Sequence, residues 1–245
     1  MIDLAPTRTF LDRFSRDLDQ QDSLPMRRRA DLHAGDLRDH RAARFAWAHR
    51  VVDEYRSVVV FTELLAHLAA VEAPYTAIAA VHRLIGDELR HARLCARVSG
   101  FFGPLDELEI ALDDLGLPPT DDPPVWRAIE IVALELVVAE EESVRIMRVY
   151  RDATTDAACR DALSVLLADE VRHAATGRAL LELLIGAFAD ESIAPRLAAL
   201  PRALAEERRH IVATHASFAN DGPGRMYGAS IRANEAPRAR EVVSP

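Results

Sequence analysis

Apolar residues recur at intervals of three and four along most of the chain, which is the pattern of helices that bury one face. Gly and Pro interrupt this pattern at a few places, and these breaks predict where each helix begins and ends. Four long helices are expected, at about residues 38–71, 75–99, 124–152 and from the segment ATTDAA to about 186. In that segment Thr154, Thr155 and Asp156 are the candidates to cap the fourth helix. The pattern therefore predicts an all-α fold.

The connections between these helices predict how they pack. Short turns join the first helix to the second and the third to the fourth, so each pair should be an antiparallel hairpin. About two dozen residues separate the second helix from the third, which fits a crossover along the length of a four-helix bundle. Shorter helices are expected near 5–20, at 105–115 and at about 191–217, and the tail beyond about 230 should be poorly ordered.

We therefore expect a single domain over residues 1–245. Its core bundle would occupy about 38–186, with a helical extension at 1–37 and a C-terminal helix and tail at 187–245.

One six-residue string occurs twice, as DELRHA at 87–92 and as DEVRHA at 169–174. In both copies a Glu and a His, three residues apart, fall on the face that otherwise carries core residues. The predicted core positions are Val81, Ile85, Glu88, His91, Cys95 and Val98 in the second helix, and Leu163, Leu166, Glu170, His173, Gly177, Leu180 and Leu184 in the fourth. A buried carboxylate without a partner costs several kcal/mol, so a compensating group should lie nearby.

The other two long helices each place one carboxylate in an otherwise apolar stripe. These are Glu54 in the first helix and Glu140 in the third. At about 1.5 Å per residue, the distances from the predicted turns bring all four Glu residues to nearly the same level. Glu135 is an alternative to Glu140, because its spacing of 35 residues from Glu170 resembles the 34 between Glu54 and Glu88.

Four Glu and two His at one level of a helical bundle predict a dinuclear metal site. The expected ligands are Glu54, Glu88, His91, Glu140, Glu170 and His173. Oxygen-rich ligation with one imidazole per ion suits iron or manganese better than zinc or copper. Asp87 and Asp169 lie four residues before the His of their own helix, so each is expected to accept that ring's second N–H. Arg90 and Arg172 would then neutralise the two Asp residues.

These motifs resemble those of the ferritin-like superfamily. The two D-E-x-R-H strings are similar to the metal helices of bacterial multicomponent monooxygenases and related O2-activating di-iron proteins, and the resemblance covers about residues 38–186. It implies an oxidoreductase with two iron ions, O2 and a small organic substrate. Manganese or a mixed iron–manganese pair, with peroxide consumption, and a ferroxidase or other iron-handling protein remain alternatives. No dinucleotide fingerprint is present, so electrons would come from an external donor.

The resemblance also directs attention to residues around the expected metals. An apolar lining would keep an oxidant away from water, and small side chains could leave room for the substrate. The candidate lining residues are Val58, Phe61, Cys95, Leu136, Leu166 and Gly177. Some di-iron N-oxygenases have an additional His ligand one turn before the last Glu-x-x-His, where this chain has Leu166. A seven-ligand site of that kind is therefore not expected.

Composition narrows the remaining possibilities. A net charge of −9 disfavours nucleic acid as a partner. No apolar run is long enough to cross a bilayer, the first residues do not read as a signal peptide, and Cys95 and Cys159 form no CxxC pair. A cytoplasmic protein is expected, with a homodimer as one of the assemblies open to it. A third Glu-x-x-His, Glu207 with His210, has no matching partner helix and is predicted to bind no metal.

Overall fold

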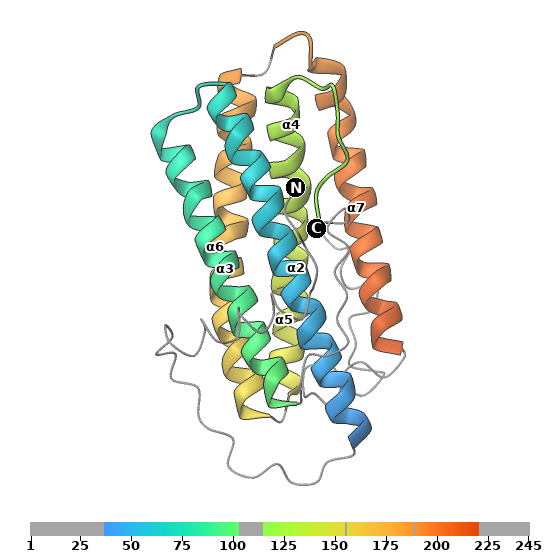
Figure 1. Ribbon diagram of the computed structural model, residues 1–245. Helices are drawn as coiled ribbons and strands as arrows, with labels where there is room; N and C mark the ends of the chain where they lie inside the picture. Colours follow the sequence, from blue (N-terminus) through green and yellow to red (C-terminus); the bar gives the residue numbers. More distant parts are fainter. Residues whose placement is uncertain (1–36, 103–114, 155, 189, 221–245) are drawn as a thin grey trace.

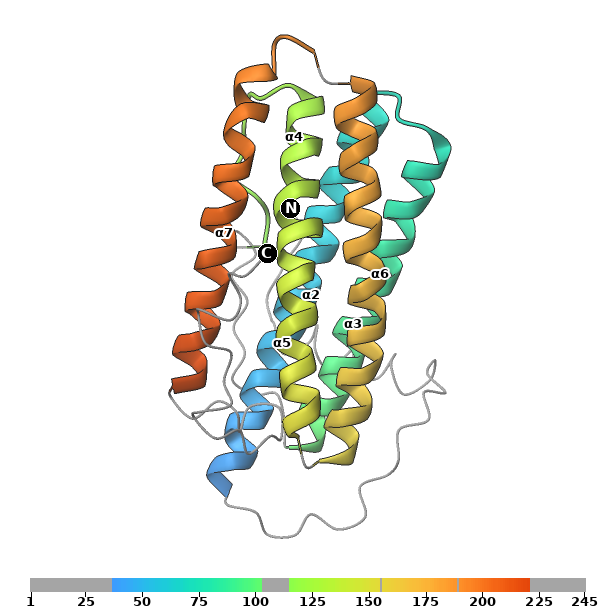
Figure 2. The ribbon, with the colours of Figure 1, turned by 180° about the vertical axis from the view of Figure 1, so that it is seen from behind.

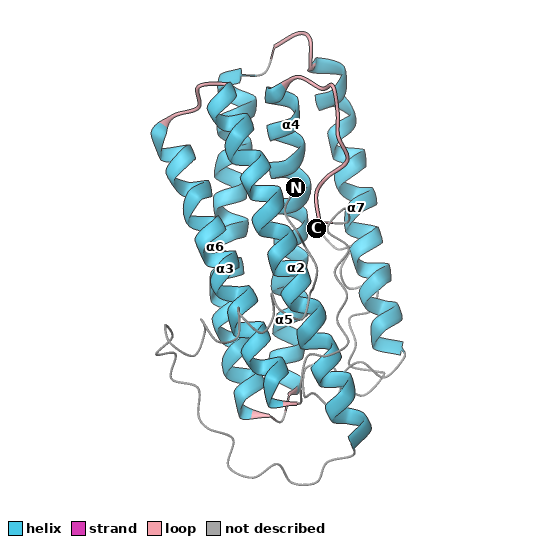
Figure 3. Ribbon diagram, in the orientation of Figure 1, coloured by secondary structure: helices cyan, strands magenta, loops and turns pink. Residues whose placement is uncertain are grey.

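The computed structural model describes residues 37–102, 115–154, 156–188 and 190–220 (Figure 1). Within these ranges the fold is all-helical, as the sequence predicts, and Figure 3 shows helices joined by loops. The helices are α2 (Leu37–Ala70), α3 (Tyr75–Phe101), α4 (Pro124–Ile131), η2 (Val132–Ala139), α5 (Glu140–Ala153), α6 (Ala157–Phe188) and α7 (Ala194–Asn220). The expected helix near 5–20, nearly all of the one at 105–115 and the tail beyond 230 lie outside the described residues.

The helices lie side by side along one long axis (Figures 1 and 2). α2 and α3 form one antiparallel hairpin, and the rod made by α4, η2 and α5 forms a second with α6. α3 ends at one end of the molecule and α4 begins at the other (Figure 1), and most of the expected crossover between them, residues 103–114, lies outside the described residues. α7 packs against η2 and α5, on the side of that rod away from α6.

Local sequence explains several helix boundaries. Asp156, one of the three expected capping residues, begins α6: its Oδ1 accepts a hydrogen bond from the Cys159 backbone N–H at 3.0 Å. Pro74 and Pro123 directly precede α3 and α4, where the missing N–H costs no helical hydrogen bond. Glu72, in the turn before α3, has a φ of 54°, a left-handed conformation that lets the chain reverse.

Two apolar clusters fill the interior. The upper cluster, in the view of Figure 1, contains residues such as Phe61, Leu68, Leu84, Ile129 and Leu184. The lower cluster contains residues such as Trp47, Val51, Cys95, Met147 and Leu166. All of the core positions predicted for the second and fourth helices are buried except Ile85, which is half-buried. Along α2, α3 and α6, the predicted carboxylates and histidines lie between the residues of the two clusters.

The third predicted helix differs from expectation in its backbone. The sequence predicts an uninterrupted α-helix over 124–152, but η2 is a π-helical segment that ends directly before Glu140. Such segments widen the helix and change which face the following residues present. η2 also approaches α6 closely. A Cβ added at Gly177 of α6 would lie only 2.8 Å from the carbonyl oxygen of Leu136 in η2. Gly177 therefore permits this contact.

We expect Gly177→Ala to destabilise the protein by about 1–3 kcal/mol, because the new methyl group would overlap the Leu136 backbone. Gly186→Ala on the same helix is the matched control. An added Cβ there meets nothing within 4 Å, so helix propensity alone should stabilise the protein by up to about 1 kcal/mol. Denaturant unfolding of both variants measures the difference. Equal stabilities would show that η2 and α6 do not need this close approach.

Candidate metal centre

The structure brings the six predicted ligand side chains together between the two apolar clusters. Each is at most 6% exposed, although each ionises in water. The six side chains form two sets, which share Glu170. Within each set the ligand atoms all lie within 4.8 Å of one another, close enough to hold a metal ion. The first set is Glu88, Glu140, Glu170 and His173, and the second is Glu54, His91 and Glu170.

Both histidine rings turn Nδ1 towards the carboxylates. His173 Nδ1 lies 3.0 Å from Glu88 Oε1 and 3.1 Å from Glu170 Oε2. His91 Nδ1 lies 3.4 Å from Glu54 Oε2 and 3.6 Å from Glu88 Oε2. The Nε2 atom of each ring points the other way, to an aspartate. Each imidazole thus presents one nitrogen to the cluster and has the other fixed by a hydrogen bond, as metal-binding histidines require.

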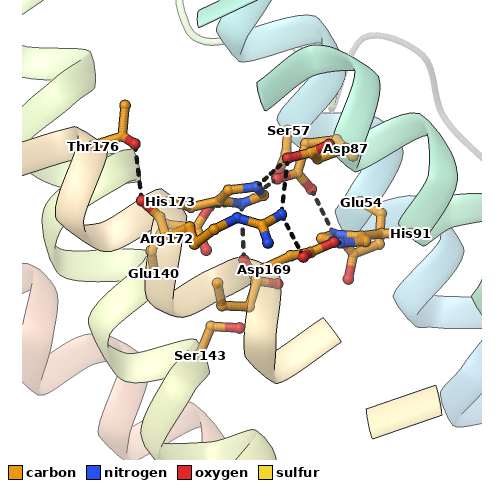
Figure 4. A network of polar contacts seen from close by, with 12 residues as sticks. Glu54, Ser57, Asp87, His91, Glu140, Ser143, Asp169, Arg172, His173 and Thr176 are labelled. Carbon is orange, nitrogen blue, oxygen red and sulfur yellow. Dashed lines mark hydrogen bonds and ion pairs between the residues drawn. The ribbon is translucent and has the colours of Figure 1, made fainter. Parts of the chain in front are cut away.

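The aspartates serve the opposite helices, which corrects the expectation that each serves the His of its own helix. His91 Nε2 donates to Asp169 Oδ2 at 3.0 Å, and His173 Nε2 donates to Asp87 Oδ2 at 3.3 Å (Figure 4). The reason is that α3 and α6 pack against each other in opposite directions. Each imidazole extends across this interface, so its outer nitrogen reaches the Asp of the facing helix.

Arg90 and Arg172 complete a ring of charges with the two aspartates, as the sequence predicts. Arg90 pairs with Asp87 and, at 3.2 Å, with Asp169, while Arg172 lies 2.5 Å from Asp169 and 3.6 Å from Asp87. Burial disfavours the charged form of Asp169, but His91, Arg172 and Arg90 outweigh it and lower its pKa to about 2. The pKa of Asp87 is also lowered, by Arg90 and His173 against burial. Both aspartates are therefore ionised acceptors.

The four Glu side chains of the cluster differ in the direction of their pKa shifts. Burial raises the pKa of Glu88 to about 7 and, with the neighbouring Glu170, raises that of Glu140 well above its ordinary value. The pKa of Glu54 is lowered because Arg50 and His91 outweigh the effect of burial, and that of Glu170 is lowered by hydrogen bonds from Glu140 and His173. Without metal, protons therefore hold part of the cluster together.

The pKa values of both histidines are raised by the carboxylates around them. Burial disfavours the charged ring of His173, but the adjacent carboxylates of Glu170 and Glu88 raise its pKa to about 10. The pKa of His91 is raised well above its ordinary value, against burial, by Asp169, Glu54 and Glu88. A metal ion entering the cluster would replace these protons, as metal binding to His and carboxylate ligands does generally.

Two buried atoms test whether the residues fit a metal. His91 Nδ1 and Glu88 Oε1 have no hydrogen bond within the described part of the chain, and the 3.0 Å approach of His173 to Glu88 is outside hydrogen-bonding geometry. Unsatisfied buried polar atoms are rare and need an explanation. A cation bound between these atoms would satisfy both, and the oxygen-rich donor set is one that iron or manganese prefers.

The structure distinguishes the two candidates on the third helix. Glu140 is buried in the cluster, whereas Glu135 forms a two-pronged ion pair with Arg56 of α2, at 3.0 and 2.8 Å. The third Glu-x-x-His lies outside the cluster, on α7, where Glu207 is half-buried and His210 is exposed.

Sequence reasoning missed one member of the site, Arg50. Its Nε lies 2.5 Å from Glu54 Oε1, and its Nη2 lies 3.0 Å from Ser143 Oγ and 3.4 Å from Glu170 Oε1. The signal was available, because Arg50 lies four residues before Glu54, on the same side of a helix. An arginine among predicted core residues is the feature that should have drawn attention.

The residues expected to line a substrate pocket are divided between the two apolar clusters. Phe61 and Leu136 belong to the upper cluster, Cys95 and Leu166 to the lower cluster, and Val58 is half-buried. The expectation that Gly177 leaves room for a substrate is wrong, because the Leu136 backbone fills the space beside it. Gly177 allows two helices to approach each other instead.

No family model matches this chain, and no curated protein or solved structure is significantly similar to it. The argument for function consequently depends on the geometry of the site. None of the helices in the described ranges combines the length and the apolar character needed to cross a membrane.

Proposed function

We propose that this protein is a ferritin-like di-iron oxidoreductase that activates O2 to oxidise or oxygenate a small organic substrate. The observation that carries the proposal is the cluster itself. Two Glu-x-x-His pairs turn both Nδ1 atoms inward, and two further Glu residues come from two other helices. The all-helical fold, with its two hairpins and long connection between them, supports the same assignment.

Each group of residues has a distinct task in this proposal. The six ligands would hold two ions, and a pair of ferrous ions supplies two electrons to O2 when bound. Asp87 and Asp169 fix the orientation and protonation of the two imidazoles. The apolar clusters above and below the site exclude water from it. An external reductase or other donor would supply electrons for repeated turnover.

Oxygen uptake tests this function. Protein reconstituted with two Fe(II) under nitrogen and then mixed with O2 should consume about one O2 per iron pair, because two electrons reduce O2 to the level of peroxide. Glu170→Ala should lose this uptake, and Glu135→Gln, outside the cluster, should retain it. Uptake that continues with excess Fe(II) would indicate a ferroxidase instead. Manganese in the isolated protein, with peroxide disproportionation, would indicate a peroxide-consuming enzyme.

A further inference from the structure

A row of arginines follows the outer face of α3. Arg83, Arg90 and Arg97 are seven residues apart, which places them on one face of the helix, and Arg93 lies between the last two. Arg90 reaches Asp169 of α6 at 3.2 Å, so this face is the one beside α6. The arginine row, defined as these four residues, therefore lies along the edge where α3 and α6 meet.

This edge carries a net positive charge. Arg83, Arg93 and Arg97 form no ion pair with any residue in the described part of the chain. The two acidic residues of α3 are already engaged, one in the Asp–Arg ring and the other in the ligand cluster. On the facing edge of α6, Arg172 adds a positive charge and Asp161, at one end, a negative one. Five arginines thus outnumber three aspartates, on a protein whose net charge is −9.

The same edge lies over the histidine side of the proposed metal centre. His91 donates to Asp169 at 3.0 Å, and Asp169 lies 2.5 Å from Arg172, whose side chain is 59% exposed. These three side chains lead from a proposed ligand to solvent, on the side of the bundle away from α7 (Figure 2). Electron tunnelling slows steeply with distance, so a redox partner bound at this edge would have a short route to the metals.

The surface along the arginine row also fits a protein partner. Gly86 and Ala168 are small and Val165 is 40% exposed, so a partner can approach both helices closely. Apolar contacts combined with arginines are typical of protein interfaces. A second copy of this chain would bring the same arginines into contact and be repelled, and nucleic acid would meet the negative charge of the whole protein. An acidic protein is the partner that this charge pattern favours.

We propose that the arginine row on α3, together with Arg172 of α6, is the docking surface for an acidic one-electron carrier protein of the iron–sulfur or flavin class. The inference deepens the proposed function and rests on it, since that function requires an external electron donor. In each cycle two carrier molecules would lose one electron each, and two ferric ions would become ferrous, with no atom transferred. The opposite charges steer the carrier to this edge and orient it there.

Surface plasmon resonance on the metal-free protein tests the docking surface without turnover. A plant-type ferredoxin and a flavodoxin, both acidic, are the probes. At least one should bind at low ionic strength and be released in about 1 M salt, where charges are screened beyond about 3 Å. The Arg83→Gln/Arg93→Gln/Arg97→Gln variant should bind that carrier about tenfold more weakly or less at low salt.

The matched control removes the same charge from other faces of the molecule. Arg148→Gln/Arg202→Gln/Arg209→Gln changes three exposed arginines on α5 and α7 and should bind the carrier like wild type. A loss of equal size in the control would mean that net charge alone acts, which would overturn the assignment. In stopped-flow experiments on iron-loaded protein, the arginine-row variant should be reduced more slowly by the carrier. It should not be reduced more slowly by reduced methyl viologen, a small cation.

Two further results would overturn the docking surface. One is binding of neither carrier to wild type, and the other is binding of a DNA duplex to the arginine row in place of both carriers. Failure of the proposed function is recognised separately, because wild type would then take up no metal, whatever the binding result. If wild type loads two ions and reacts with O2 but the arginine-row variant binds the carriers like wild type, only the docking surface is wrong.

Discussion

Loading the site with two divalent ions should raise the melting temperature by about 10 °C or more. An ion present at a thousandfold excess over its dissociation constant stabilises the folded state by about 4 kcal/mol, and in a protein of this size 1 kcal/mol corresponds to about 2–4 °C. The Glu88→Ala/Glu170→Ala double variant should lose the rise, because it removes one carboxylate from each Glu-x-x-His pair. Calorimetric melting with and without Fe(II) or Mn(II), under nitrogen, measures both.

The surface Glu-x-x-His on α7 provides the control for this experiment. Glu207→Ala/His210→Ala removes the same residue types at the same spacing, but outside the cluster. Its melting temperature should rise with metal as much as that of wild type. If the cluster variant also kept the full rise, the ions would be bound elsewhere on this acidic protein.

The second large effect should come from the crossed aspartates. Asp169→Asn should weaken metal binding by about 10–100-fold, because the amide no longer stabilises the donating imidazole of His91. The loss should depend on which histidine remains. In a His173→Ala background the remaining ion is held by His91, so the full loss is expected. In a His91→Ala background the ion is held by His173, and Asp169→Asn should change its affinity less than about threefold.

Asp87→Asn is the mirror experiment, because Asp87 accepts from His173. Its effect should be large in the His91→Ala background and small in the His173→Ala background. Competition with a metallochromic chelator gives the affinities. The opposite dependence would mean that each Asp supports the His of its own helix, and the crossed arrangement would be wrong.

Much of this arrangement was readable in the sequence, because helical periodicity determines both the elements and the faces. The expected bounds 38–71 and 75–99 differ by at most two residues from α2 and α3. The level at which Glu54, Glu140 and Glu170 meet followed from their distances to the turns, since a helix rises by a constant amount per residue. Asp156 as the cap of α6 followed from its hydrogen-bonding chemistry.

What the sequence did not predict depends on contacts between helices. The crossed pairing of His91 with Asp169 requires the register of α3 against α6, which no single helix contains. The π-helical segment VALELVVA contains no Gly or Pro that would predict it. Its close contact with α6, where Gly177 lies against Leu136, is visible only in the folded structure. Arg50 joins the site because Glu170 and Ser143 come to it from two other helices.

The central claim is that the six buried side chains bind two metal ions, and metal content tests it most directly. Tag-free wild type and Glu88→Ala/Glu170→Ala, both reconstituted with Fe(II) or Mn(II) under nitrogen and desalted, are measured by inductively coupled plasma mass spectrometry. The account predicts about two ions per chain in wild type and close to none in the variant. Equally low metal in both proteins would contradict it, and the repeated D-E-x-R-H strings would then be a buried network of ion pairs.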